Sequence, residues 1–423
     1  MFFGDRMLLI NRFIWLFVMV LILFFGIFLS FKLKGIQFKF RSMFSYVFCG
    51  GSSSFGILMT SLAGRIGVGS IAGVCLSIYI GGVGSIFWMW VSTFFCAVIT
   101  YSEVVLGVKF KKINGSDYYG GPSYYIRDGL GNKLLGGVYS ILIIVSYIGC
   151  FLCIQSNTIT KSIISISPFS PYIVGLCISV VTFFCIYGGF KSIVGVCNKL
   201  VPIMSLIYIG SSFVILFLNI DKIGSVFFSI FKSAFSIKSF FGSFIPMVII
   251  GIQRGIFSNE AGIGTSSIVS SSGSDNDFRG QGFVQMFGVY ITTLVICTAT
   301  AIIILFSDFS SFNLSNINGI ELASHAFSYH FGNIGIYILV VSVILFSFST
   351  IITGYYYGES SFNYFFKHIN IKYIYILRGV TLVVLFFGSV LPSGLIWAFV
   401  DILVGIMVII NLYAIWRLRD RIE

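Results

Sequence analysis

A run of polar residues and glycines interrupts an apolar part of the chain at residues 251–267, GIQRGIFSNEAGIGTSS. It places Arg254, Ser258, Asn259 and Glu260 where a membrane-spanning helix is normally apolar, and an ionisable group there must be paired or line a cavity. Glycines allow the chain to unwind, and unwound backbone inside a membrane is tolerated only where it faces protein or water. We interpret this stretch as a broken helix at a binding site. The alternative is a polar loop between two short helices.

A second interrupted stretch lies at residues 63–73, AGRIGVGSIAG. Both stretches carry an arginine followed by G-x-G, with glycines at 67 and 69 in one and at 262 and 264 in the other. Paired interrupted segments in matching positions of two halves are typical of transporters built as inverted repeats. The two stretches therefore predict one shared site.

The chemistry of such a site follows from the helix break. The N-terminus of a half-helix carries partial positive charge and unpaired N–H groups, so it can hold a carboxylate. The exposed carbonyl groups at the end of the other half can coordinate a hard cation such as sodium. A small zwitterion fits both ends. The hydroxyl groups of Ser349 and Thr350 are candidates to complete the cation shell, although such residues also serve in helix packing.

Four acidic residues lie in or near the predicted spans: Glu103, Glu260, Glu359 and Asp401. We expect the first and third to lie near span ends, where a charge reaches water. Glu260 and Asp401 lie deeper, and Arg65 and Arg254 are the candidate partners. We predict that these four deeper charges, two acidic and two basic, have a structural or gating role: Glu260, Asp401, Arg65 and Arg254.

The composition identifies the class of protein. Of the 423 residues, 57% are hydrophobic and 9% charged, with a mean hydropathy of +1.01, and soluble domains do not reach such values. The net charge of +12 comes from basic residues spread over short loops, which favours membrane orientation over nucleic-acid binding. The nine cysteines lie in or beside apolar segments, and we interpret them as packing residues.

The spacing of apolar segments predicts eleven membrane spans, one extra N-terminal helix at residues 13–31 and ten further spans. These ten lie at residues 44–80, 84–108, 134–158, 171–188, 200–219, 240–265, 281–306, 334–358, 373–391 and 394–416. Most of the 26 lysines and arginines fall on one side when the basic loop after the first helix is placed in the cytoplasm. The N-terminus is then outside and the C-terminus is cytoplasmic. We also expect an amphipathic segment along the inner surface at residues 120–132.

Several colinear motifs resemble the alanine/glycine:cation symporter family. They cover most of the chain and read GRIGVGSIAG (64–73), GGVGSIFWMW (81–90), YYGGPSYYIRDGL (118–130), QSN (155–157), RGIFSNEAGIGTSS (254–267), VICTATA (295–301), FSTI (348–351) and YYGE (356–359). The S-N-E-A-G-x-G block is the most specific of them.

This resemblance implies an all-α, leucine-transporter-type fold with a five-plus-five inverted repeat and discontinuous spans 1 and 6. The division would be residues 1–43 for the extra helix and its basic loop, 44–219 for the first repeat and 220–423 for the second. It implies sodium-coupled uptake of alanine and glycine across the plasma membrane, without a cofactor. The sequence does not determine the oligomeric state.

The resemblance also implies site residues. Those near the substrate would be Gly67, Val68, Gly69, Ser70, Gln155, Ser258, Asn259 and Thr350. Sodium would be held by the carbonyl groups of Ala63 and Ile66 and the hydroxyl groups of Ser349 and Thr350.

This sequence departs from the family pattern at four places around the expected site. Ser70 stands where the family has asparagine, Thr292 where it has aspartate, Thr353-Gly354 where it has Gly-Trp, and Gly56 where it has glutamine. Proton coupling, a different amino acid substrate and a non-transporting paralogue that only binds amino acids therefore stay open as alternatives. An enzyme is disfavoured, because the three histidines lie outside the predicted spans. No P-loop motif is present, so an ion gradient would drive the transport.

Overall fold

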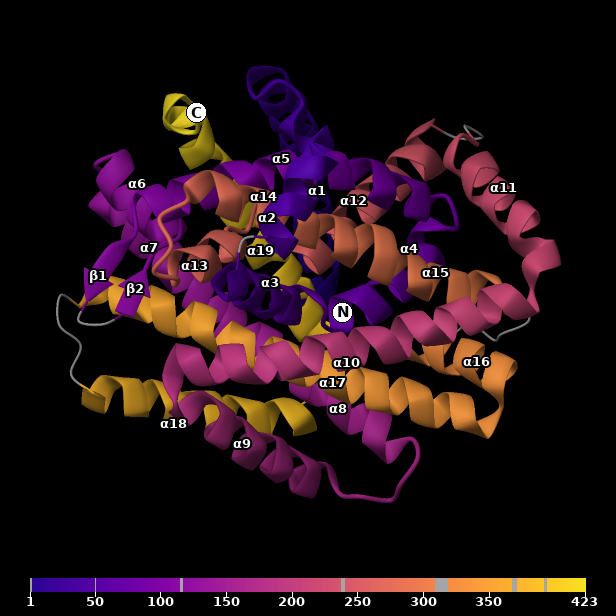
Figure 1. Ribbon diagram of the computed structural model, residues 1–423. Helices are drawn as coiled ribbons and strands as arrows, with labels where there is room; N and C mark the ends of the chain where they lie inside the picture. The colour runs from indigo at the N-terminus through magenta and orange to yellow at the C-terminus, as the bar shows by residue number, and fades with distance from the viewer. Residues whose placement is uncertain are drawn as a thin grey trace.

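The computed structural model describes residues 2–49, 51–114, 117–236, 240–308, 319–366, 371–391 and 394–423. This part of the chain is almost entirely helical, with one short hairpin (Figure 1). Eight helices are long and apolar enough to cross a membrane, or nine when one bent pair counts as a single span. The prediction of an all-α polytopic membrane protein is therefore confirmed.

The first half of the chain contains α1 (Phe2–Lys32), α2 (Phe40–Phe48), α3 (Gly51–Arg65), α4 (Val74–Gly81), α5 (Ser85–Lys109), α6 (Pro122–Gly129), α7 (Lys133–Ile144), α8 (Leu152–Ile164), α9 (Pro171–Tyr187) and α10 (Gly189–Leu218). The second half contains α11 (Ile223–Ala234), α12 (Ile245–Asn259), α13 (Thr265–Ser271), α14 (Phe278–Tyr290), α15 (Thr298–Leu305), α16 (Ile320–Phe331), α17 (Asn333–Phe362), α18 (Ile371–Val390) and α19 (Gly394–Arg417). The antiparallel strands β1 (Lys112–Asn114) and β2 (Asp117–Tyr119) pair Lys112 with Tyr119.

Four π-helical turns lie within or beside these helices: η2 (Gly69–Gly73), η3 (Val145–Phe151), η5 (Phe240–Phe244) and η6 (Ile291–Cys297). These turns were not predicted from the sequence. η3 joins α7 to α8, and η6 joins α14 to α15, so that each forms one continuous apolar span. π-helical turns frequently occur at functional sites.

The helices form two packed groups. In one group α5 packs against α12, α13 and α14. In the other, α17 packs against α8 and α10, while α18 packs against α8 and α9, and α10 and α17 run side by side in Figure 1. α3 contacts α10 and α17 of the second group and also α13 and α14 of the first, so the first interrupted span lies where the two groups meet.

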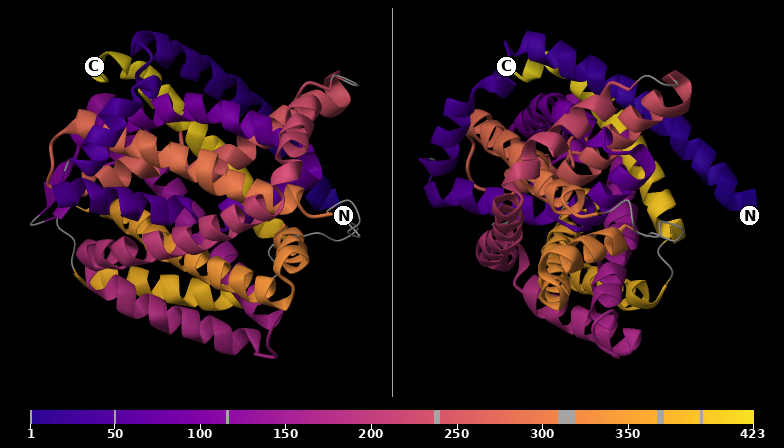
Figure 2. Two further views of the ribbon diagram at one scale, coloured as in Figure 1. Left: turned by 45° about the vertical axis from the view of Figure 1, so that its right-hand side comes forward. Right: turned by 90° about the vertical axis from the view of Figure 1, so that its right-hand side faces the viewer.

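The N-terminal helix packs along α19 and α5. The indole N–H of Trp15 donates to the carbonyl of Asp401 at 3.1 Å, and Lys32 pairs with Asp420 at 2.6 Å. The end of α1 therefore lies beside the C-terminus, and the two termini lie at opposite ends of the molecule in the left view of Figure 2.

Two predicted boundaries differ from the structure, and a third agrees with it. The start of predicted span 1 belongs to the separate helix α2, whereas α3 begins at Gly51. Helix α10 begins at Gly189 rather than near residue 200, because Lys191 and Lys199 are exposed and carry their charges to the surface from within the helix. Predicted span 4 corresponds to α9, a helix of 17 residues. The count of eleven spans and the internal repeat remain predictions.

A close helix contact makes one glycine important for packing. A Cβ atom at Gly251 of α12 would lie 2.5 Å from the carbonyl oxygen of Ser85 at the start of α5. Gly251 thus allows the two backbones to approach, as small residues do at membrane helix interfaces.

We expect Gly251→Leu to lower the free energy of unfolding by about 1–3 kcal/mol, the usual effect of overpacking. Thermal unfolding of the purified protein in detergent measures this change. Gly210→Leu is the matched control, because no atom lies within 4 Å of a Cβ built at that exposed position. Equal unfolding temperatures for the two variants would contradict the assignment.

Candidate functional site

The first span breaks after Arg65. The helical pieces on either side, Ser54–Arg65 and Gly69–Gly81, are bent by 57°. The freed N–H of Val68 donates to the Gln155 side-chain oxygen at 3.3 Å, and the N–H of Ser70 donates to the Gly67 carbonyl at 3.1 Å. A Cβ atom at Gly67 would lie 2.4 Å from the Thr350 hydroxyl oxygen, so only glycine fits against α17 here.

The second break lies between α12 and α13. Glu260 and Gly264 have left-handed backbone conformations, with φ of 56° and 84°. The Asn259 side-chain oxygen accepts from the N–H of Ala261 at 3.0 Å, and its amide group donates to Thr293 at 3.1 Å. Asn259 thus supports the break and connects it to η6. The predicted interruption of both spans is present in the structure.

The carbonyl groups of the second break are bonded by side chains from distant helices. Asn411 of α19 donates to the Gly262 carbonyl at 2.9 Å, and the Tyr139 hydroxyl of α7 donates to the Ile263 carbonyl. The same Asn411 amide group donates to Glu103 at 2.9 Å. Glu103 is fully buried, so the expectation that it reaches water is wrong. Glu359, with 6% of its surface exposed, is also buried.

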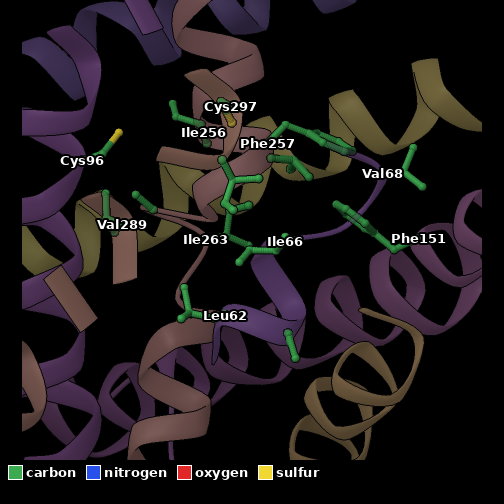
Figure 3. Packing of buried hydrophobic residues seen from close by; sticks show 14 of the residues in the cluster. Leu62, Ile66, Val68, Cys96, Phe151, Ile256, Phe257, Ile263, Val289 and Cys297 are labelled. Atoms are coloured by element: carbon green, nitrogen blue, oxygen red, sulfur yellow. The ribbon is translucent and has the colours of Figure 1, made fainter. Parts of the chain in front are cut away.

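Serine hydroxyl groups connect the two interrupted spans. The hydroxyl oxygens of Ser70 and Ser258 are 2.8 Å apart, and the Ser258 oxygen is 3.0 Å from the Cys297 sulfur. Thr300 donates to the Ser70 carbonyl at 2.8 Å. Around these polar contacts, Ile66 and Ile263, one from each break, lie in the same apolar cluster, with Phe257 and Cys297 close by (Figure 3).

The Glu260 carboxylate is buried and bonded to three hydroxyl groups. Tyr147 and Thr265 donate to it at 2.8 Å, and Tyr357 donates at 3.2 Å. These donors come from η3, α13 and α17. Because a buried carboxylate must recover the hydrogen bonds that it loses with water, this arrangement fixes the second break against two other helices.

The two deep arginines have different partners. Arg254 forms an ion pair with Asp401, with 2.9 Å between the guanidinium nitrogen and the carboxylate oxygen. Arg65 donates instead to the Ser266 hydroxyl and to the Gln285 carbonyl, the latter at 3.1 Å. Within the described part of the chain, the structure therefore joins Arg254 to α19 and Arg65 to the helices that follow the second break.

Two hydroxyl groups of α17 converge on the end of α3. The Ser349 and Thr350 oxygens each lie 3.0 Å from the Ala63 carbonyl oxygen. Both also lie near the Phe346 carbonyl of their own helix, at 2.8 and 3.1 Å. Each hydroxyl can thus donate its hydrogen within α17 and present a lone pair toward α3. The buried Ile66 follows in the unwound segment.

An aromatic series runs from Glu260 toward the molecular surface. Tyr147 stacks on Phe151, Phe151 on Phe257, and Phe257 contacts Trp397, with ring centroids 4.6, 5.0 and 5.2 Å apart. Trp397 also lines a cavity of about 360 Å³ that reaches Val68 and Ala72 of the first interrupted span. The break is therefore adjacent to a cavity of the size that binds small molecules.

A family model described as the sodium:alanine symporter family matches residues 3–422. The chain belongs to the sodium:alanine symporter family. Its relatives include the sodium/alanine symporter AgcS of Methanococcus maripaludis, 34% identical over 95% of this chain and 92% of the relative. The amino-acid carrier protein AlsT of Bacillus subtilis is 34% identical over 99% of this chain and 90% of the relative. From the same species, the "Probable sodium/glutamine symporter GlnT" is 34% identical over 95% of this chain and 85% of the relative.

Membership in this family establishes a multi-pass membrane transporter and not an enzyme. The departures from the family pattern can now be placed. Thr292 donates to the Gly288 carbonyl at 2.9 Å and Thr353 to the Ser349 carbonyl at 3.0 Å, so both hydroxyl groups are bonded within their own helices. Ser70 belongs to the first interrupted span, and its hydroxyl group contacts that of Ser258 in the second.

Several residues that hold the breaks were not predicted from the sequence, notably Tyr147, Tyr357, Thr293, Cys297 and Asn411. Each is a polar or sulfur-containing side chain within an apolar span, which is the available sequence signal. That signal is weak, because tyrosine, threonine and cysteine are common in membrane helices and their partners lie far away in the chain.

The Arg254–Asp401 pair predicts a large effect on stability. Asp401→Asn leaves a buried guanidinium without its counter-charge, which we expect to lower the free energy of unfolding by about 3–5 kcal/mol. Thermal unfolding in detergent measures the change. Asp420→Asn, which removes an exposed partner of Lys32, is the control and should have little effect. A similar small effect for both variants would show that the buried pair does not stabilise the fold.

Proposed function

We propose that this protein imports small neutral amino acids, alanine and glycine, together with sodium across the cell membrane. The observation that carries the proposal is the convergence of Ser349 and Thr350 on the Ala63 carbonyl, directly beside the break in the first span. It supplies hard oxygen ligands next to freed backbone N–H groups. A cation and a carboxylate can thus bind as neighbours.

Sodium suits the oxygen atoms at the end of α3. The Ala63 and Ile66 carbonyl groups and the Ser349 and Thr350 hydroxyl groups would form its shell. Hard cations favour such neutral oxygen ligands. The Phe346 carbonyl supports this assignment. Each hydroxyl group can donate its hydrogen to that carbonyl while a lone pair on the hydroxyl oxygen faces the ion.

The amino acid would bind at the first break. Its carboxylate would accept from the N–H groups near Val68 and Gly69, in place of the Gln155 side-chain oxygen, whose bond to Val68 is long at 3.3 Å. Ser70, Ser258 and Thr350 would border the rest of the substrate. The glycines and serines leave room for a small side chain, and the name of the relative AgcS agrees with alanine.

The cavity beside Trp397 would be the path from outside, and the aromatic series would close over the bound substrate. On the other side of the site, the bonds of Glu260, Arg65 and Asn259 would form the cytoplasmic gate, while Arg254 and Asp401 would hold α12 to α19. The repeats at residues 44–219 and 220–423 would move against each other, with the N-terminus outside and the C-terminus in the cytoplasm.

Ser70 and Thr292 favour a second candidate, a proton-coupled transporter or a paralogue that binds amino acids without moving them. Both positions carry a hydroxyl group where the family has a side chain that is a stronger cation ligand. The coupling ion is therefore the first quantity to measure.

Uptake of labelled alanine and glycine into liposomes that contain the purified protein tests the proposal. We expect accumulation with an inward sodium gradient and none without it. Accumulation driven by a proton gradient alone would show that protons, and not sodium, are the coupling ion. Binding of alanine to the folded protein without accumulation under either gradient would establish the non-transporting alternative. Unlabelled glutamine, added as a competitor, tests the substrate named for GlnT.

The sodium ligands give a separate prediction. Thr350→Ala should raise the sodium concentration for half-maximal uptake about tenfold or more, since a contact with a charged group contributes roughly 1.5–3 kcal/mol. Ser342→Ala is the matched control, because this buried serine of α17 bonds the Ile338 carbonyl of its own helix. The control should keep the wild-type sodium dependence. An unchanged sodium dependence in Thr350→Ala would place the ion elsewhere.

A further inference from the structure

A second pocket, separate from the site between the breaks, lies at the start of α7. Its volume is about 690 Å³. The hairpin, α6, the first turns of α7 and the 3-10 turn after α17 (η9, Asn363–Phe365) surround it. Two candidate membrane spans, Lys133–Ile164 and Asn333–Phe365, begin and end at this pocket. It therefore lies at the level where the hydrocarbon of the bilayer meets water.

The polar part of the pocket is positively charged. Lys112, Arg127 and Lys133 line it, and its lining contains no acidic residue. Asp128, just outside, pairs with Lys112 at 3.1 Å and with Arg127 at 2.9 Å. Lys133 is exposed and forms no ion pair with any residue that the structure describes. The three basic side chains of the lining therefore outnumber Asp128, and the excess of positive charge suits an anion.

The apolar part of the pocket continues along the outer face of α7. Leu134 is 81% exposed, Ile141 52% and Val138 41%, and Phe365 on the opposite wall is 46% exposed. These side chains follow one another at helical spacing, away from the basic residues. A long acyl chain could lie along them while its charged head stays between the lysines and the arginine.

The pocket also contains an unsatisfied polar group. Asn363 has only 4% of its surface exposed, and neither its side-chain nitrogen nor its oxygen makes a hydrogen bond of normal geometry, although the Tyr119 hydroxyl lies nearby. Buried amide groups are normally bonded, and a polar headgroup in the pocket could complete the hydrogen bonds of this one. The Arg127 guanidinium, which also lines the pocket, lies 5.1 Å from the centroid of the Tyr364 ring.

We propose that this pocket binds an anionic phospholipid, with its phosphate among Lys112, Arg127 and Lys133 and one acyl chain along α7. Basic pockets beside membrane helices are suited to anionic headgroups, and the exposed apolar face distinguishes a lipid from a free phosphate. Helix α7 also carries Tyr139, whose hydroxyl bonds the Ile263 carbonyl of the second break. A bound lipid would thus support the helix that holds that break.

Native mass spectrometry of the delipidated protein in detergent, titrated with phosphatidylglycerol, tests this proposal without any transport measurement. We expect the first phosphatidylglycerol to bind more tightly than phosphatidylcholine. Lys133→Gln should weaken its binding about fivefold, the usual contribution of one basic residue near a membrane surface. Lys232→Gln, at an exposed lysine of α11, is the control and should leave the affinity unchanged.

Three outcomes would overturn the proposal. Equal affinity for the two lipids would show that the charge of the headgroup is not recognised. Unchanged phosphatidylglycerol binding in Lys133→Gln would place the lipid elsewhere. Equally tight binding of glycerol 3-phosphate would show that the pocket takes a soluble phosphate and that the apolar face of α7 plays no part.

Discussion

Backbone groups released by two helix breaks must find partners in a region that water does not freely reach, and this requirement organises the centre of the protein. The Gln155 side chain accepts a hydrogen bond from the N–H of Val68, and the Asn259 side chain accepts one from the N–H of Ala261. Asn411 bonds the carbonyl of Gly262. Each of these side chains would otherwise be a poor choice for a membrane span. Their positions follow from the breaks, and the breaks follow from the glycines that permit them.

The same requirement determines which helices come together. The donors to Glu260 lie on η3, α13 and α17, so one carboxylate joins elements more than 200 residues apart in sequence. In a medium of low dielectric constant such a network is strong when complete and costly when one member is missing. The helices therefore depend on one another through polar contacts at the centre as well as through apolar packing around it.

The sequence alone predicted the membrane class, both breaks and the four deep charges, because these are local departures from an apolar pattern. It named an arginine as the partner of Asp401, and Arg254 is that partner, but the other partners were not predicted. Glu260 was expected to pair with an arginine but bonds hydroxyl groups instead, and Glu103 was expected near water but is buried beside Asn411. Hydropathy along the chain shows how deep a residue lies in one helix and not which neighbour faces it. The π-helical turns were missed for a related reason, since a single additional residue hardly changes an apolar pattern.

The π-helical turn η3 allows one membrane span to bond two different neighbours. Residues in an α-helix are spaced by about 100°, so the additional residue in a π-helical turn rotates everything beyond it by roughly that angle. In η3, Tyr147 faces Glu260, whereas beyond the turn Asn157 donates to the Leu391 carbonyl beside α18, at 2.7 Å. If the same residues formed an uninterrupted α-helix, Asn157 would face another direction relative to Tyr147, and one of these bonds would be lost. The π-helical turn is therefore as necessary to the contacts of this span as the side chains that make them.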